Sequence, residues 1–154
     1  MKPTIALNIQ TVLYDLDSEI PYSKEAFELL CGTCAQESAF GKYRKQIGGG
    51  PALGIFQMEP ATFDDCVENY LVYRPDLYDL ILDISDVTNL YSKDLETNDI
   101  LSTCMARVKY LRATGAIPTT LEGQAAYWKQ HYNTYKGKGT VEEYIRNYKK
   151  YCTL

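Results

Sequence analysis

The sequence predicts a mainly α-helical protein with one irregular segment, and three observations carry this prediction. Apolar residues recur three and four positions apart over most of the chain, as they do on the buried face of a helix. Several of these stretches begin with a typical capping residue, such as Ser23 or Thr140. Residues 38–58 lack the helical period and are rich in glycine. Because 154 residues suit one domain and no repeat or linker is visible, residues 1–154 are predicted to form a single domain.

Two helices are predicted before the irregular segment. The first runs from Pro3, a residue suited to a first helical turn, to about Leu13. The second runs from Lys24 to about Glu37, with Ser23 as its cap. Their apolar stripes contain Ile5, Ile9, Val12 and Leu13 in the first helix, and Phe27, Leu30, Cys31 and Cys34 in the second.

The segment that follows is predicted to be a long loop with a small β or loop element at about residues 40–58. Its glycines and Pro51 permit tight turns, and no helical period survives between Ser38 and Met58. A loop of this length inside a small domain is typical of a functional segment.

Five more helices are predicted in the remainder of the chain. Pro60 begins a helix that continues from Ala61 to about Tyr70, and a short buried helix follows over residues 77–84. The polar residues 85–98 are expected to be irregular. The helix with the most regular apolar stripe is predicted over 99–114, where it would form the centre of the core.

Capping signals delimit these later helices. Asn98 or Thr97 caps the central helix, and Gly115 is predicted to end it as the glycine just beyond its last turn. Thr119 or Thr120 starts the next helix, which extends through Trp128. Thr140 and Glu143 form a capping box for the last one.

The charge distribution narrows the choice of partner. The formal net charge is −4, but the acidic excess lies in residues 1–126, and residues 127–154 carry an excess of lysine and arginine. This basic end fits either contact with an anionic polymer or a solvated helix face. Its basic density is too low for nucleic acid. No apolar run approaches the ~18 residues of a membrane span, and no export signal is visible, so we expect no membrane insertion.

The cysteines favour a structural role. Five cysteines form an odd, irregularly spaced set, which indicates reduced thiols. Cys31 and Cys34 form a CxxC pair that fits a buried helix face or a redox site. With one histidine and no second CxxC, no metal site is predicted.

Glu37 is the strongest candidate for a catalytic residue. It ends an apolar helix, where the helix dipole is negative, and Phe40, Phe56 and Met58 lie close in the sequence. Such a setting raises the pKa of a carboxyl group, and an acid that stays protonated near neutral pH can protonate the leaving oxygen of a glycosidic bond. The alternative is a solvated carboxylate, or an ion pair with a nearby cation: Lys42, Arg44 or Lys45.

Three short motifs carry a resemblance to a known family. The pair Glu37-Ser38, the stretch Gly54-Ile55-Phe56-Gln57 and the triplet Pro60-Ala61-Thr62 together resemble the lytic transglycosylases of bacteria and phages, in the lysozyme superfamily. Tyr110-Leu111 and Ala126-Tyr127-Trp128 fit the family pattern more loosely, and the resemblance covers about residues 23–135. Trp128 stands where the family has asparagine, so either Tyr127 or Tyr132 would take the role of the family's tyrosine near the catalytic acid.

The resemblance implies a lysozyme-like α+β domain that cleaves peptidoglycan between N-acetylmuramic acid and N-acetylglucosamine. Glu37 would act first as acid and then as base, and the product would carry a 1,6-anhydro ring, with no metal or cofactor. Substrate contacts would come from Ser38, Phe56, Gln57, Tyr127 and Tyr132. From the residues alone, Ser38 could instead bond to its own backbone, and Gln57 could brace the loop.

A second carboxylate would favour a hydrolytic lysozyme instead. The candidates Glu59, Asp64 and Asp65 all lie at the start of a predicted helix, a position that favours negative charge without catalysis. A further alternative is a wall-binding or virion structural protein that does not catalyse. If the protein is an enzyme encoded by a phage, we expect it to be made in the host cytoplasm. It would reach the wall through a holin lesion or as part of a virion.

Overall fold

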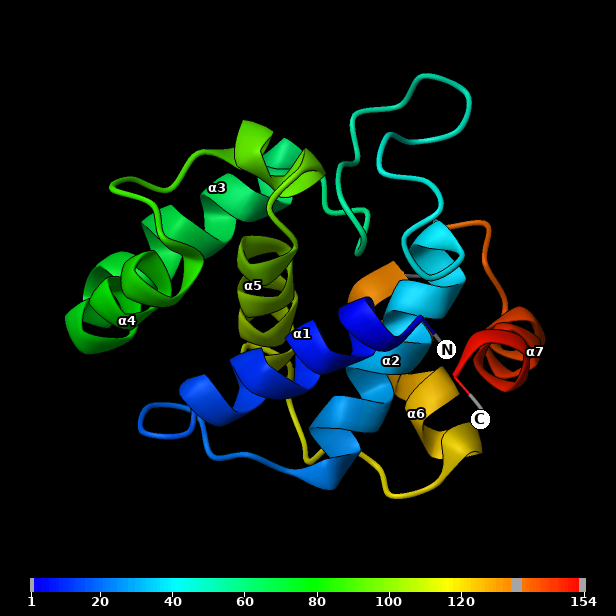
Figure 1. The fold of residues 1–154 in the computed structure, drawn as a ribbon. Helices are drawn as coiled ribbons and strands as arrows, with labels where there is room; N and C mark the ends of the chain where they lie inside the picture. The colour runs from blue at the N-terminus through cyan, green and yellow to red at the C-terminus, as the bar shows by residue number, and fades with distance from the viewer. Residues whose placement is uncertain (1, 134–136, 153–154) are drawn as a thin grey trace.

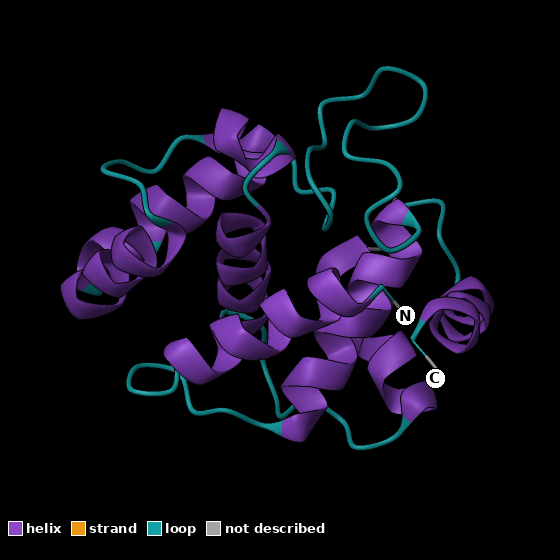
Figure 2. Ribbon diagram, in the orientation of Figure 1, coloured by secondary structure: helices purple, strands orange, loops and turns teal. Residues whose placement is uncertain are grey.

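Helix α5 (Asp99–Leu111) stands at the centre of the molecule and contacts α1, α2, α3 and α4. Figure 1 shows it between α3 and α4 on one side and α2 and α6 on the other. The computed structural model describes residues 2–133 and 137–152, which form seven α-helices and no strand (Figure 2). The prediction of a mainly helical protein is confirmed.

The other helices follow the predicted order closely. Their bounds are α1 Pro3–Asp15, α2 Lys24–Ser38, α3 Pro60–Asn69, α4 Pro75–Ser85, α6 Leu121–Trp128 and α7 Val141–Tyr151. Three short helical turns accompany them: the 3-10 turns η1 (Leu71–Tyr73) and η2 (Ser92–Glu96), and the π-helical turn η3 (Lys129–Asn133). Within residues 2–133 and 137–152, no helix is long and apolar enough to cross a membrane.

Side-chain caps fix where four helices begin. Ser23, Asn98, Thr120 and Thr140 each accept a hydrogen bond from the backbone N–H three residues further on. These bonds satisfy donors that have no partner inside the helix. Asn98 and Thr120 are thereby selected from the two pairs of candidate caps.

Two boundary predictions were wrong. Helix α5 ends at Leu111 rather than Thr114, because its final turn tightens and Ala113 N–H donates to Tyr110 O, three residues back. Gly115 has a left-handed φ of 83° but lies beyond this end, so it does not cap the helix. The region predicted to be irregular, 85–98, contains η2.

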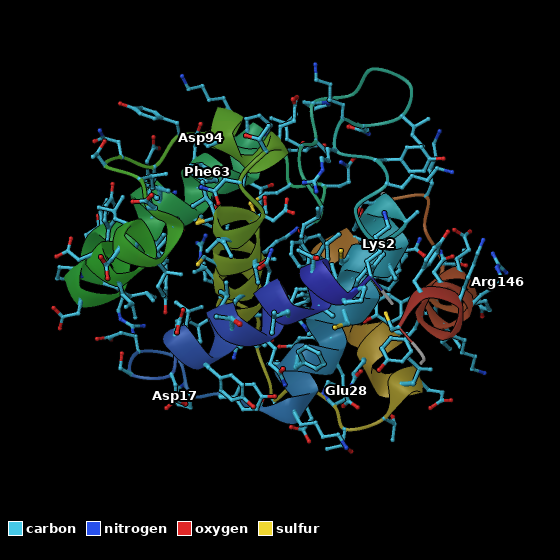
Figure 3. All side chains as sticks on the ribbon, viewed as in Figure 1. Lys2, Asp17, Glu28, Phe63, Asp94 and Arg146 are labelled. Carbon is cyan, nitrogen blue, oxygen red and sulfur yellow. The ribbon has the colours of Figure 1, made fainter. Side chains whose placement is uncertain are left out.

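Two clusters of buried apolar side chains form the core, and α1 and α5 contribute to both. The first cluster joins α1, α2, α5, α6 and α7, and the second joins α1, α3, α4 and α5. Phe63 of α3 belongs to the second cluster, whereas Arg146 of α7 lies at the outer edge of the molecule (Figure 3). The C-terminal half of α2 contributes Cys34 and Ala35 to the first cluster, so this end of the helix is firmly packed.

The segment between α2 and α3 is a loop in which the predicted small β element is reduced to two isolated bridges. Lys45 pairs with Leu53, and Leu53 pairs with Met58. Left-handed backbone at Gly54 and Gln57 interrupts the extended geometry that a longer hairpin needs. The loop rises above the end of α2 (Figure 1).

Candidate active site

A cleft of about 790 Å³ lies beside the C-terminal end of α2. Its walls come from that helix end, the loop before α3, the first turn of α3, helix α5, η3 and the segment that leads into α7. The lining residues are Gln36, Glu37, Tyr43, Gln46, Ile47, Ala52, Gln57, Glu59, Thr62, Lys109, Tyr132, Asn133, Gly137, Lys138, Gly139 and Glu143.

Glu37 lies in the wall of this cleft, at the penultimate position of α2. Its side chain is largely buried, and this burial raises the pKa of the carboxyl to about 7. A hydrogen bond from Trp128 and the positive charge of Lys109 act in the opposite direction and are outweighed. The expected upward shift of the pKa is confirmed, and burial is its main cause.

The alternative role of Glu37 as an ion-pair partner for the neighbouring cations is not found. Arg44 pairs with Asp99, and Lys45 lies 3.6 Å from a carboxylate oxygen of Glu96. Both cations therefore pair with carboxylates of η2 and α5 and not with Glu37. Among the described residues, Glu37 has no ion pair within 4.0 Å.

Trp128 is the residue that the sequence analysis did not assign to the site. Its indole Nε1–H donates to Glu37 Oε2 at 3.0 Å, and its ring is fully buried, 5.2 Å from the ring centre of Tyr144. The packing of α6 against α7 thus holds the carboxyl in place. The signal was present in the sequence, because Trp128 stands where the resemblance expects an asparagine.

Lys109 is the second residue that was missed. Its ammonium donates to the backbone oxygen of Tyr132 at 2.9 Å and lies 3.9 Å from the centre of that ring. Burial lowers the pKa of Lys109, while Glu37 and Glu59 act to raise it. Lys109 lies four positions after the buried Met105 on α5, a spacing that could have predicted an inward-facing side chain.

Of the two candidate tyrosines, Tyr132 lies at the cleft and Tyr127 does not. The Tyr132 hydroxyl donates to Phe56 O at 2.7 Å, whereas the Tyr127 hydroxyl donates to Gly115 O at 3.1 Å, away from the cleft. Tyr127 is therefore not among the residues that line the cleft beside Glu37. Tyr132 follows Trp128 by four positions and so faces the same side, while Tyr127 is turned by about 100° from it.

Ser38 and Phe56 were expected to contact substrate, and both are instead buried. The Ser38 hydroxyl lies 2.7 Å from Ile55 O and accepts from Gly41 N–H at 2.8 Å. The Phe56 ring is in the first core cluster, and only its backbone oxygen faces Tyr132. These residues fasten the loop to the end of α2 and lie out of reach of a ligand.

Gln57 lines the cleft as predicted. Its amide nitrogen donates to Gly54 O at 3.0 Å and lies 3.4 Å from Tyr43 O, so the bracing role that was left open is present as well. Among the described residues its amide oxygen has no partner. That oxygen can accept a hydrogen bond from a ligand.

The cleft also contains carboxylates other than Glu37. Of the three predicted candidates, only Glu59 lines it, and Glu143 of α7 lies on the wall as well, which the sequence analysis did not anticipate. Asp65 bonds to Arg112 at 2.8 Å, outside the cleft. Two further carboxylates, Glu59 and Glu143, therefore line the same cleft as the candidate acid.

The CxxC pair has none of the properties of a redox site. Cys31 and Cys34 are buried with free thiols, and burial raises the pKa of each thiol. A reactive cysteine needs a lowered pKa and access to solvent, so the oxidoreductase interpretation is contradicted. Within the described parts of the chain, no group of three or more His, Cys, Asp or Glu side chains is placed to hold a metal ion.

Comparison of the chain with protein-family models, with curated proteins and with solved structures finds no match. The chemistry of the cleft itself is therefore the basis on which a function can be proposed.

Proposed function

We propose that the protein is a peptidoglycan-cleaving enzyme of lysozyme-like fold, in which Glu37 protonates the oxygen of a β-1,4 glycosidic bond. The observation that carries the proposal is a single carboxyl group with a pKa of about 7 in the wall of a 790 Å³ cleft. General acid catalysis works best when the pKa of the acid is close to the working pH. An ordinary surface glutamate is deprotonated at pH 7 and could not donate a proton.

The contacts of Glu37 support delivery of a proton from one particular oxygen. Because the Trp128 indole N–H bonds to Oε2, the proton of the neutral acid is favoured on Oε1. The rigid indole limits rotation of the carboxyl group, so the acid is oriented before a substrate arrives. Lys109 lies near enough to stabilise the carboxylate that remains after proton transfer.

The remaining walls suit a chain of amino sugars. The exposed ring of Tyr43 offers aromatic surface for a sugar ring, and Gln57 and Asn133 offer amide groups for hydroxyl and N-acetyl groups. Lys109 and Lys138 would attract the carboxylates of peptidoglycan. Glu59 and Glu143 in the same cleft oppose this attraction, so the amide and aromatic groups, rather than the net charge, support an amino-sugar chain as the substrate.

The proposed reaction needs no water molecule. Glu37 gives its proton to the bridging oxygen as the bond from that oxygen to C1 of the muramic acid breaks. The carboxylate then takes the proton of the muramic acid 6-hydroxyl as O6 bonds to C1, which closes the 1,6-anhydro ring and restores the acid. The substrate's own N-acetyl group can stabilise the positive charge that develops at C1.

Hydrolysis is the second candidate, and the presence of Glu59 in the cleft favours it. In that mechanism the second carboxylate acts as a nucleophile or directs water to C1. Mass spectrometry of digested glycan strands separates the two reactions. We expect fragments that are one water lighter than ordinary reducing ends, and fragments that all end in reducing muramic acid would exclude the transglycosylase.

A wall-binding or virion protein without activity is the remaining alternative. It predicts that the purified protein binds peptidoglycan but releases no fragments from it. The proposed enzyme would meet the glycan either after a holin opens the membrane or as part of a virion, and it has no proposed role with nucleic acid.

The hydrogen bond from Trp128 should be visible in the pH dependence of the reaction. Trp128→Phe removes a bond that lowers the pKa of Glu37, so the fall in activity above pH 7 should move to higher pH. The smaller ring should also lower stability by roughly 1–3 kcal/mol. Rates of wall clearing from pH 5 to pH 9 test this.

Tyr144→Phe is the matched control for that experiment. It removes a buried hydrogen bond to Leu29 O from the ring that packs on Trp128, but it leaves Glu37 untouched. Stability should fall while the pH profile stays in place. An unchanged pH profile in Trp128→Phe would show that the indole does not tune the acid.

A further inference from the structure

A second pocket, of about 330 Å³, lies at the opposite end of α2 from Glu37. It is bordered by the first turn of α2, the last turns of α5 and the segment 113–117. It shares no lining residue with the cleft. Since α2 has 15 residues, the two sites are roughly 20 Å apart.

Arg107 of α5 lines this pocket in an unusual state. Arg107 is buried, with a relative exposure of 9 %. In residues 2–133 and 137–152 its guanidinium forms no hydrogen bond and no ion pair, whereas Arg44, Arg74 and Arg112 each pair with a carboxylate. Burial lowers the pKa of its guanidinium, as expected for a charge without a partner.

The guanidinium of Arg107 opens into the pocket. No fully buried side-chain nitrogen or oxygen among the described residues lacks a hydrogen-bond partner. The unpaired nitrogens of Arg107 must therefore keep some access to the space beside them. A mostly buried guanidinium that has five N–H donors and opens into a pocket is free to bind an anion there.

The beginning of α2 adds a second source of positive potential. The hydroxyl of Ser23 already accepts from Ala26 N–H, but the first N–H groups of the helix have no partner within it. The helix dipole places positive potential at the same point. Both Ser23 and Arg107 line the pocket, so a carboxylate held there would meet donors from two directions.

The other walls limit the kind of anion. Glu25 lines the pocket but forms no ion pair with Arg107 within 4.0 Å. It would repel a phosphate dianion and attract an ammonium group. Leu111, Ala113 and Ile117 give the pocket an apolar side, and the stacked rings of Tyr110 and Tyr127 close another.

We propose that this pocket binds a small amino-acid zwitterion, with its carboxylate on Arg107 and its ammonium group near Glu25. The carboxylate of a zwitterion would pair with the guanidinium of Arg107, and its ammonium group would pair with Glu25. The ligand therefore adds no net charge to the pocket. Bidentate pairing of guanidinium with carboxylate is geometrically favourable. The proposal does not depend on the chemistry of Glu37.

Titration of the full chain with l-alanine tests the proposal, with amide chemical shifts measured by NMR at constant ionic strength. We expect saturable shifts confined to residues 23–26 and 113–117. Acetate, which lacks the ammonium group, and alaninamide, which lacks the carboxylate, should each bind at least about tenfold more weakly. Absence of saturable shifts with alanine, or equal binding of acetate, would overturn the zwitterion.

Three variants assign the binding to residues. Arg107→Met should weaken alanine binding at least about tenfold, whereas Arg112→Met removes a neighbouring charge of the same helix region and should leave it unchanged. Glu25→Gln should reduce the affinity for alanine to that for acetate. Full binding by Arg107→Met, or tighter binding of inorganic phosphate than of alanine, would contradict the assignment.

Discussion

Glu37→Gln is expected to lower the rate of peptidoglycan cleavage by roughly 10²–10⁴-fold while peptidoglycan binding is retained. Glutamine has nearly the same shape but can neither donate a proton to the leaving oxygen nor accept one afterwards. Because Trp128 can still donate to the amide oxygen, the fold around the site should be preserved. The release of soluble fragments from purified walls measures the rate, and a pull-down with insoluble walls measures binding.

Glu59→Gln is the matched control, since it changes a second carboxylate in the same cleft. In the transglycosylase mechanism its rate should stay within a few-fold of the parent. A loss as large as that of Glu37→Gln would favour the hydrolytic mechanism instead. If Glu37→Gln keeps more than about a tenth of the parent activity, Glu37 is not the catalytic acid.

Glu37→Gln should also be more stable than the parent at high pH. The Glu37 carboxyl ionises near 4.5 when unfolded and near 7 when folded, so folding favours its protonated form. The parent should therefore lose stability relative to the variant as pH rises from about 4.5 to about 7, by about 2 kcal/mol after allowance for partial exposure. Urea denaturation at pH 5 and pH 8 measures this difference, and a constant difference would contradict the raised pKa.

Much of the fold could be predicted from the sequence because its signals are local. Caps at Ser23 and Thr140 and prolines at first turns mark helix starts by bonding or geometry within a few residues. The end of α5 was misplaced because Gly115 has the backbone of a capping glycine but is used in the turn that follows. A glycine shows that a left-handed residue is permitted, not where the helix stops.

The site was only partly predictable because its contacts join distant segments. Glu37 was found from its local setting and Gln57 through the family resemblance, and both line the cleft. Trp128 reaches Glu37 across 91 positions of sequence, a contact that no periodicity reveals. For Ser38, the bond to its own helix that was left open is present, with the hydroxyl 3.1 Å from Cys34 O, but its 2.7 Å contact with Ile55 O across the loop could not be predicted.

Gly54→Ala is expected to cost roughly 3–5 kcal/mol of stability and to remove most of the activity of the folded fraction. Gly54 has a left-handed φ of 81°, and a Cβ atom there would lie 2.2 Å from Leu95 O and 2.8 Å from Ser102 Oγ. A backbone oxygen cannot move aside as a flexible side chain can. The loop would have to lift away from η2, and Gln57, whose amide nitrogen bonds to Gly54 O, would move with it.

Gly48→Ala separates the two causes of this loss. Gly48 also has a left-handed φ, of 89°, but no atom lies within 4 Å of a Cβ added there. Gly48→Ala should therefore lower the free energy of unfolding by about 1 kcal/mol, which reflects backbone strain alone. Urea denaturation of both variants gives the comparison, and equal losses would show that no close approach exists at Gly54. A larger loss at Gly54, with displaced Gln57 amide signals, would mean that this glycine is required because the cleft wall packs directly on the backbone of η2.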